Sequence, residues 1–529
     1  MKYDFLVDLH RGRAAVVENM TLEQRAALKI DTPLTAFIER AAREGDPKHV
    51  VITGNAGDGK TFAAVQSVLP GMTTIVDASA RLQTDPVGLD PIEALADRIA
   101  NVLSVGRLLL AINRGQLERL ARFCRTKPHH SAAAFALAAS ERAETRPIWK
   151  PETSRDVAVI DLGLFDTTSG LIVDAMLEKV VNVDVSDLSE ETRQIVVAAT
   201  EALKSAHVRA WVKRVVLEVA ARGGHLTLRQ LWSFVAFLVV GGRPADSQSP
   251  PSLRDSVGAR LFRYEDASMF EEAILAIDPA YHLPRPDLAR MLLSDDMADT
   301  VVAAVGLPLT SADGGADVIR ALTIHDPARN PPEGVDNYQR FSTLLRAEPP
   351  GWHSHSTIAT KLLVGIYRTL GLWQAAGAFP AWQALCYDSS RLRYEGTLSA
   401  AVAANASVDP GSLRFALPRA HPAAEDALAG AWRPPCVLLA FEHAAGSRTG
   451  DALRLTPRLF RALYSPETQL LDPLTGSEMM SLERWLARAP RAGAGDVIRV
   501  SGATPTPLRV EVDPLSRKTL IAWEGSGDN

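Results

Sequence analysis

The sequence predicts an α/β domain with a parallel sheet, a helical lid that follows it, and a C-terminal α+β domain. Short apolar runs alternate with helical stretches over residues 48–185, as parallel strands and crossover helices do. The pattern is helical over residues 186–325. After a proline-rich boundary, strands and helices mix over residues 335–529. Residues 1–47 are predicted to form an N-terminal helical segment.

The composition is that of a globular protein, with 47% hydrophobic and 22% charged residues among 529. A formal net charge of −5 excludes a broadly basic surface, so any contact with nucleic acid is local or made through a partner. Cys124, Cys386 and Cys436 are far apart, which predicts neither a disulfide framework nor a zinc site and fits a reducing cytoplasm. No signal peptide is evident, and the longest apolar run, residues 231–240, is about half of a membrane span. We expect a cytoplasmic protein without membrane contact.

Two helix-start signals support the N-terminal helical segment. Residues 21–24 (Thr-Leu-Glu-Gln) begin one helix, and Thr32 caps a second helix that has Pro33 in its first turn. Arg11 and Arg13 lie upstream of the first strand, where a contact with a nucleotide base is one interpretation. Solvated charge is the favoured interpretation, because arginine side chains are mostly exposed.

Four apolar runs are predicted to form the parallel sheet. Each is rich in aliphatic or β-branched residues and leads into a turn and a helical stretch. Ligands of such sheets bind beyond the carboxyl ends of the strands. Polar residues that end the runs, Asp77, Asn113 and Asp161, are therefore candidate site residues. The runs are residues 50–53, 73–77, 107–113 and 157–161.

The first strand leads into the strongest motif of the sequence. Residues 54–61, called the glycine-rich loop below, match the phosphate-binding pattern G-x-x-x-x-G-K-[ST] at every fixed position. A helical stretch, residues 62–68, follows, so the motif has the strand–loop–helix context that it requires. The sequence thus predicts a P-loop NTPase core over residues 48–185. The predicted nucleotide-binding residues of the loop are Gly54, Asn55, Ala56, Gly57, Asp58, Gly59, Lys60 and Thr61.

Each residue type in this loop has a chemical reason. The glycines allow a tight turn whose backbone N–H groups approach the phosphates without interference from a Cβ atom. Lys60 is expected to reach the β- and γ-phosphates of ATP, and the Thr61 hydroxyl to ligate Mg²⁺. Asp58 puts a carboxylate in an anion-binding loop, so its side chain is expected to point outward or to touch the metal shell, and the outward direction is favoured.

The sequence contains only part of the set of residues expected for ATP hydrolysis. An efficient ATPase has an acidic pair after an apolar strand, with one carboxylate at Mg²⁺ and a glutamate that polarises the attacking water. No Asp-Glu pair follows any of the four runs. Asp161 is assigned as the metal-side carboxylate and Asn113 as a sensor of the γ-phosphate. It is equally open that Asp161 caps the turn before Gly163 and that Asn113 forms a turn before Gly115. The predicted catalytic residues are Lys60, Asp161 and Asn113, and the predicted metal ligands are Thr61 and Asp161.

The helical region has the features of a lid. Residues 190–205, 208–221 and 228–240 are predicted helices with short connections, and Thr227 is placed to cap the last of them. The motion of such a lid would report whether nucleotide is bound. Arg229 is a candidate contact of the γ-phosphate, although a solvated arginine on an amphipathic helix is the favoured interpretation.

The order of these segments resembles the AAA+/STAND-type ATPases of prokaryotic anti-phage and DNA-restriction loci, and among them the ATPase component of phosphorothioation-dependent restriction. The resemblance covers about residues 48–285 and depends mainly on the glycine-rich loop. It implies binding of ATP and Mg²⁺, a helical lid, and action in a complex with a nuclease, helicase or modification sensor. The segments that carry it are residues 54–61, 76–79, 110–117, 159–162, 227–231 and 276–280.

Three functions are compatible with these observations. The favoured one is an ATP-binding, slowly hydrolysing, regulatory or motor subunit of a multi-protein antiviral defence complex. A second is a nucleotide-dependent scaffold that does not hydrolyse ATP, which the missing glutamate supports. A P-loop kinase is less favoured, because neither a cluster of lid arginines nor an acceptor pocket is evident. Contact with DNA is expected to be indirect, and homo-oligomerisation is open.

The C-terminal region is predicted to be an α+β domain with an antiparallel sheet and a role in recognition or assembly. Helices are predicted at residues 357–371, 456–463 and 479–489. His353 and His355 suggest a metal site, but a surface loop is favoured because a third ligand is missing. The predicted strands are residues 413–417, 436–441, 496–500 and 508–512.

Overall fold

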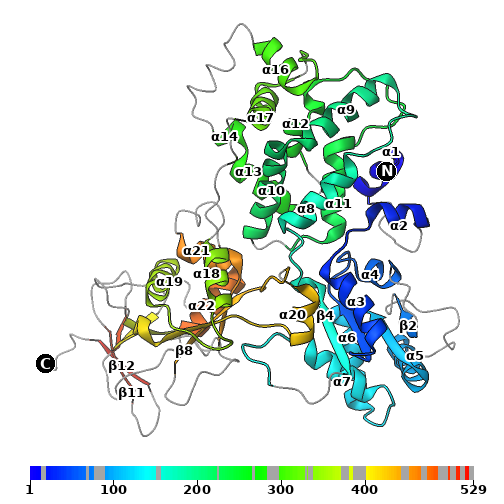
Figure 1. Ribbon diagram of the computed structural model, residues 1–529. Coiled ribbons are helices and arrows are strands. Elements are labelled where there is room, and N and C mark those ends of the chain that lie inside the picture. Colours follow the sequence, from blue (N-terminus) through cyan, green and yellow to red (C-terminus); the bar gives the residue numbers. More distant parts are fainter. Residues whose placement is uncertain are drawn as a thin grey trace. The chain divides into compact units, whose positions relative to one another are not determined.

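In the computed structural model, the chain folds into two compact units (Figure 1). The first contains Met1–Thr145, Trp149–Val335 and Ala420–Arg433, and the second contains Arg146–Ile148, Asp336–Arg419 and Pro434–Asn529. The residues that the structure describes are 1–12, 20–66, 71–76, 90–150, 156–222, 225–264, 268–282, 297–311, 313–327, 331, 337–370, 380–384, 401–429, 431–442, 452–465, 474–486, 498–500, 508–512 and 519–523.

The first unit contains a four-stranded parallel sheet with the strand order β2-β3-β1-β4. Ile52 on the central strand β1 lies opposite Ala111 on one side and Ile160 on the other. Every residue of β1 and β4 is buried, as expected for aliphatic strands that are covered on both faces. The predicted α/β class and parallel sheet are confirmed, whereas Asp77 lies outside the described residues. The strands are β1 (His49–Thr53), β2 (Met72–Ile75), β3 (Arg107–Ala111) and β4 (Val157–Asp161).

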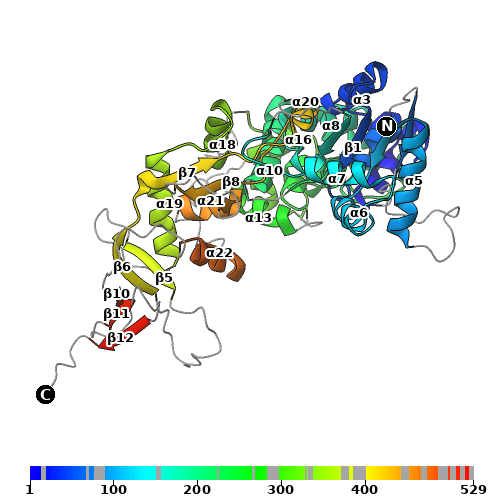
Figure 2. The same cartoon turned by 90° about the horizontal axis from the view of Figure 1, so that it is seen from below.

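Helices cover both faces of this sheet, as Figure 2 shows around β1. Val51, Leu110 and Val159 share a hydrophobic cluster with α5, α6 and α7. On the opposite face α20 packs against β4 and α3. Helix α4 lies against β1 and β3. Alternate residues of each strand therefore meet different helices. These helices are α3 (Pro33–Glu44), α4 (Lys60–Gln66), α5 (Pro91–Val105), α6 (Arg114–Thr126), α7 (Ala133–Arg142) and α20 (Pro422–Leu428).

The rest of the first unit is helical. The predicted helices at residues 190–205, 208–221 and 228–240 are confirmed as α9, α10 and α11. The N-terminal helix α1 packs against α11, where the Ser233 hydroxyl donates to the His10 carbonyl at 2.9 Å. These helices are α1 (Tyr3–His10), α2 (Leu22–Leu28), α8 (Gly170–Val180), α9 (Glu190–Lys204), α10 (Ala206–Ala221), α11 (Leu228–Val240), α12 (Val257–Leu261), α13 (Ser268–Ile277), α14 (Pro279–His282), α16 (Met297–Val305) and α17 (Gly315–His325).

The second unit contains two antiparallel sheets, of order β7-β8-β9 and β12-β11-β10-β6-β5. The predicted strands correspond to β7, β8, β10 and β11, whereas β5, β6, β9 and β12 were not predicted. The elements are α18 (Asn337–Ala347), α19 (Ser356–Thr369), β5 (Pro380–Ala384), β6 (Ala401–Ser407), β7 (Leu413–Ala416), β8 (Val437–Phe441), β9 (Leu453–Leu455), α21 (Pro457–Tyr464), α22 (Gly476–Leu486), β10 (Ile498–Val500), β11 (Leu508–Val512) and β12 (Thr519–Trp523).

Two histidines of the second unit share one carboxylate. His353 Nδ1 lies 2.7 Å and His355 Nε2 lies 3.2 Å from oxygens of Glu348. Within the described ranges, no group of three or more His, Cys, Asp or Glu residues is suited to hold a metal ion. None of the helices described here has both the length and the apolar character needed to cross a bilayer.

Candidate functional site

The glycine-rich loop joins β1 to α4 at the carboxyl edge of the parallel sheet. Gly54, Gly57 and Gly59 have φ angles of +139°, +92° and +90°, which L-residues with a Cβ atom rarely adopt. Space is also limited: a Cβ atom on Gly54 would lie 2.8 Å from Asp58 Oδ2 and 3.2 Å from the Gly163 nitrogen. Both conformation and packing therefore explain why glycine occupies these positions.

Lys60 is the first residue of α4 and its side chain is buried. Its ammonium group donates to the carbonyl oxygen of Asn55, across the loop. Burial lowers the pKa of Lys60 below its usual value, the Asp58 and Asp161 carboxylates partly offset this, and the Arg229 charge adds to it. The structure thus brings the predicted residues Lys60, Asp161 and Arg229 into one electrostatic environment.

Asp58 corrects one expectation, because its side chain points into the loop and is only 2% exposed. Its Oδ2 accepts the backbone N–H of Asn55 at 2.6 Å, and its Oδ1 lies 2.9 Å from His225 Nε2. The prediction of an outward side chain was therefore wrong. A buried carboxylate is tolerated where donors satisfy it, and here a loop amide and a distant imidazole surround it.

Residues 225–229, called the lid segment below, pack directly on this loop. Thr227 caps α11 through a capping box with Gln230, as its position in the sequence predicted. The backbone N–H of Arg229 donates to the Gly57 carbonyl at 3.2 Å, and Leu228 Cδ1 would lie 2.9 Å from a Cβ atom on Gly59. The backbone of Arg229 is therefore at the loop, while the contact of its side chain with a γ-phosphate stays a prediction.

Asp161 ends β4 and is 4% exposed. Its Oδ1 accepts the Gly163 N–H at 2.9 Å, which is the capping role left open by the sequence. Its Oδ2 accepts a bond from Arg114 Nη1 at 2.7 Å. Arg114 was missed because only a fold that aligns β3 with β1 puts it here: its own N–H donates to the Gly54 carbonyl at 3.2 Å.

Asn113 and Thr61 lie at the same edge of the sheet. Asn113 is the N-cap residue of α6, but its side chain makes no capping bond. Its carbonyl accepts the N–H groups of Gln116 and Leu117 at 3.0 and 2.9 Å, which is the turn that the sequence left open. Thr61 lies in the first turn of α4 and is partly buried. Neither a sensor role of Asn113 nor a metal contact of Thr61 follows from these contacts alone.

The loop that follows β4, residues 162–168 and called the β4 loop below, connects the two halves of the site. Gly163 and Leu162 lie against Gly54, since both would be 3.2 Å from a Cβ atom there. The buried Thr167 hydroxyl donates to the Leu226 carbonyl of the lid segment at 2.5 Å. The glycine-rich loop, the β4 loop and the lid segment thus contact one another.

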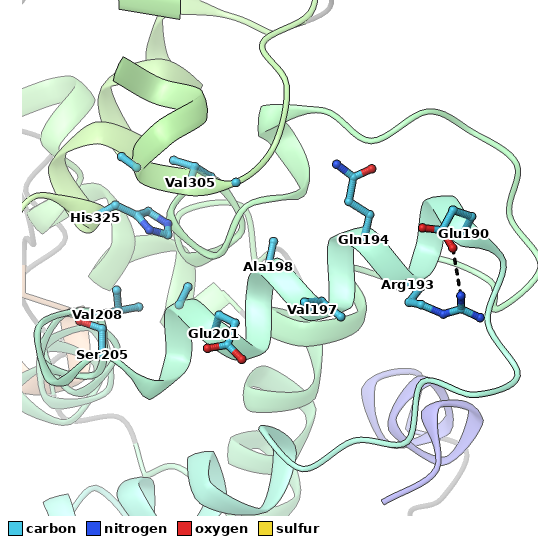
Figure 3. A pocket seen from close by; sticks show the side chains of 13 residues that line it. Glu190, Arg193, Gln194, Val197, Ala198, Glu201, Ser205, Val208, Val305 and His325 are labelled. Atoms are coloured by element: carbon cyan, nitrogen blue, oxygen red, sulfur yellow. Dashed lines mark hydrogen bonds and ion pairs between the residues drawn. The ribbon is translucent and has the colours of Figure 1, made fainter. Parts of the chain in front are cut away.

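A pocket of about 630 Å³ lies elsewhere in the first unit, along α9 (Figure 3). Glu190 and Arg193 line one end, and His325 and Val305 lie toward the other. Burial lowers the pKa of His325 to about 4, and nearby His207 adds to this effect. No residue of the glycine-rich loop, the β4 loop or the lid segment lines this pocket.

No protein-family model, curated protein or solved structure matches this chain.

Proposed function

We propose that this chain binds ATP with Mg²⁺ at the glycine-rich loop and belongs to the P-loop NTPases. The observation that carries the proposal is the full match to G-x-x-x-x-G-K-[ST] between β1 and α4, with three glycines at positive φ. Backbone N–H groups of such a loop form a concave site for anions. Lys60 would neutralise phosphate charge from within the same loop, and Arg229 would approach from the lid segment.

The residues fit a triphosphate better than they fit a complete hydrolytic site. The cradle has glycines where a Cβ atom would meet neighbouring atoms, and it has a buried cation in Lys60. The Asp58 carboxylate accepts the Asn55 N–H, so a phosphate would have to replace it at that amide. Thr61 offers a hydroxyl for Mg²⁺, which supplies charge neutralisation to phosphates when bound. Both oxygens of Asp161 already accept protein donors, Gly163 and Arg114, so a direct metal bond would replace one of these contacts.

The biological role we propose is a slowly hydrolysing, regulatory or motor subunit of a multi-protein bacterial defence complex for DNA restriction. The support is the resemblance stated above together with the lid segment at the loop, where a conformational response to nucleotide would begin. Partners would be a nuclease, helicase or modification sensor, with DNA contacted through them.

Nucleotide binding is tested with a fluorescent ATP analogue, mant-ATP, and magnesium. Lys60→Ala should weaken binding about 10- to 100-fold, the value of a charge-assisted contact with phosphate. Lys48→Ala is the matched control, because Lys48 is exposed and precedes β1 at the opposite end of that strand. Equal affinity of Lys60→Ala and wild type would overturn the proposal.

A non-hydrolysing scaffold is the second candidate, favoured by the engaged oxygens of Asp161. The two candidates differ in magnesium-dependent release of phosphate from ATP, measured with and without DNA. A slow release that is lost in Lys60→Ala supports the ATPase, and binding without release supports the scaffold. Loss of phage protection in cells that carry Lys60→Ala would support the defence role, and intact protection would contradict it.

A further inference from the structure

One segment of the first unit comes from the C-terminal part of the chain. Ala420–Arg433, called the return segment below, belongs to the first unit, whereas the residues on both sides of it, Arg419 and Pro434, belong to the second. Arg419 is fixed in the second unit by reciprocal backbone bonds with Arg146 of 2.8 and 3.0 Å. The return segment therefore joins the first unit to the second covalently at both of its ends.

The return segment is bonded to the β4 loop. The Arg433 N–H donates to the Leu164 carbonyl at 2.7 Å, and the Asp166 N–H donates to the Ala431 carbonyl at 2.6 Å. Between these bonds, Phe165 and Trp432 form an antiparallel bridge, and both side chains are buried. With one backbone bond on each side of the bridge, the two segments form a short two-stranded contact. The backbone of the return segment and that of the β4 loop are therefore expected to move together.

The side chain of Arg433 also reaches helix α10. Its Nη2 donates to the Ala220 carbonyl at 2.8 Å, in the last turn of α10. A guanidinium at this position satisfies a terminal carbonyl and interacts favourably with the C-terminal end of the helix dipole. α10 ends shortly before the lid segment. Arg433 thus contacts both the β4 loop and the helix that leads to the lid segment.

The chain enters the second unit directly after Arg433. Pro434 and Pro435 follow it, and proline fixes φ near −65°. Tyr338 Oη donates to the Pro434 carbonyl at 3.1 Å, which holds this point within the second unit. β8, the central strand of the three-stranded sheet, begins at Val437. Three residues, 434–436, therefore separate Arg433 from the start of that strand.

We infer that the return segment positions the β4 loop and α10 at the proposed nucleotide site and carries the effect of nucleotide binding to the second unit. The inference rests on the proposed function, because nucleotide at the glycine-rich loop is the input. Gly163 is the first contact of this route, since it lies against Gly54. Arg433 is a positioning residue, which acts through Leu164 and Ala220 and not on nucleotide itself.

The test uses the full chain in hydrogen-exchange mass spectrometry with and without magnesium and ATPγS. In the wild type, nucleotide should slow exchange of amides in residues 431–433 and in β8 at least about twofold. Arg433→Ala keeps the backbone bond to Leu164 but loses the bond to Ala220. It should weaken mant-ATP binding about fivefold, the effect of one lost hydrogen bond, and reduce the response of β8. Arg433→Lys should recover part of both, because it retains a donor.

Arg40→Ala is the matched control. Arg40 on α3 pairs with Asp426 of the same return segment, both side chains are about half exposed, and this ion pair does not include the β4 loop. This variant should keep both mant-ATP affinity and the β8 response within about twofold of wild type. A loss of the response equal to that of Arg433→Ala would overturn the specific role of Arg433.

The outcomes separate this inference from the proposed function. Wild-type protein that binds no more mant-ATP than Lys60→Ala would overturn both. If nucleotide binding depends on Lys60 but nucleotide does not change hydrogen exchange in residues 431–433 and β8, only the inference is overturned. The wild-type exchange experiment needs no variant, so the result stands even if Arg433→Ala fails to fold.

Discussion

Two loops at the same edge of the parallel sheet are built in different ways. The glycine-rich loop has bonds of its own in addition to its contacts with the lid segment: Asn55 receives the Lys60 ammonium at its carbonyl and bonds Asp58 through its N–H. The β4 loop and the Asp161 that precedes it are held by distant residues. Arg114 lies 47 positions away, Leu226 contacts Thr167 over 59 positions, and the return segment is more distant still.

This difference suggests that the glycine-rich loop serves nucleotide binding and that the β4 loop serves communication with distant parts of the chain. A loop that depends on local bonds and positive φ values keeps its shape wherever its short motif occurs, as a binding site for phosphate requires. A loop that depends on remote partners moves when any of them moves. We therefore expect substitutions in the glycine-rich loop to act mainly on nucleotide affinity, and substitutions around the β4 loop to act on stability and communication.

The largest change in the free energy of unfolding is expected at His325. This residue lines the pocket along α9, so its substitution should change stability without changing nucleotide binding. Burial lowers the pKa of His325 to about 4, whereas an unfolded histidine has a pKa of about 6.5. The unfolded chain therefore binds more protons between these pH values, and stability falls as the pH falls through this window. The loss amounts to about 3 kcal/mol at the acid end.

His325→Phe should remove this contribution from the pH dependence of the free energy of unfolding, measured by urea denaturation between pH 4 and 7. Mant-ATP affinity at neutral pH should be unchanged, because His325 lines the pocket along α9 and not the candidate site. Parallel pH profiles of the variant and the wild type would contradict the effect of burial.

Asp161→Ala is expected to have the next largest effect, a loss of about 2 kcal/mol in the free energy of unfolding. The substitution leaves the Gly163 N–H without its acceptor and removes the partner of Arg114. Arg114 is 44% exposed, so water compensates much of its share. Asp161→Asn is the matched variant: it keeps an acceptor for Gly163 and should lose only about half as much.

If Asp161 instead acts mainly as a metal-side carboxylate, both variants would leave stability near the wild-type value and would reduce magnesium-dependent phosphate release equally. Urea denaturation and a phosphate-release assay on the same preparations distinguish the two roles. That result would also contradict the difference proposed between the two loops, because Asp161 would then act in hydrolysis and not in holding the β4 loop in place.

Gly59→Ala tests the conformation of the glycine-rich loop and is expected to cost less stability than Asp161→Ala. Gly59 has φ of +90°, and a Cβ atom there would lie 2.9 Å from the Cδ1 atom of Leu228. Because the Leu228 atom is the end of a flexible side chain, most of the cost is conformational, about 1–2 kcal/mol. We expect mant-ATP affinity to fall together with thermal stability.

Gly115→Ala is the control for that variant. Gly115 lies in α6, and a Cβ atom there would meet nothing within 4 Å beyond the backbone of its own helix and its chain neighbours. Alanine should therefore raise stability by about 0.5–1 kcal/mol through helix propensity. Its nucleotide affinity should match the wild type. A similar loss of affinity in both variants would show that glycine replacement at this edge acts indirectly.

Much of the fold was predictable because its signals are local. Strands β1, β3 and β4 are aliphatic runs, and Thr227 with Gln230 is a start signal that the structure uses as a capping box. The glycines at 54, 57 and 59 were likewise recognisable from spacing, and each has positive φ.

The rest of the candidate site depends on contacts that no local pattern encodes. Arg114 reaches Asp161 only because β3 and β4 flank β1, and nothing in residues 420–433 indicates that they pair with the β4 loop. The prediction that Asp58 points outward follows from repulsion by phosphate, whereas the inward side chain is bonded by His225, which lies 167 positions away. Sequence reasoning fails here where a residue's environment is supplied by distant parts of the chain.

The pair of Asp58 and His225 is a side-chain contact of the glycine-rich loop with a distant residue, and it is expected to give the smallest effect. A double-mutant cycle of Asp58→Asn and His225→Ala should give a coupling of about 1 kcal/mol in the free energy of unfolding. The exposed pair of Arg40 and Asp426 should give less than about 0.5 kcal/mol in the same assay. If mant-ATP affinity is also coupled through Asp58 and His225, the lid segment contributes to binding through this contact, and the glycine-rich loop is less self-contained than its motif implies. If neither quantity is coupled, this side-chain contact does not hold the loop, and communication with the lid segment falls to the bond between Arg229 and Gly57 and to Thr167 of the β4 loop.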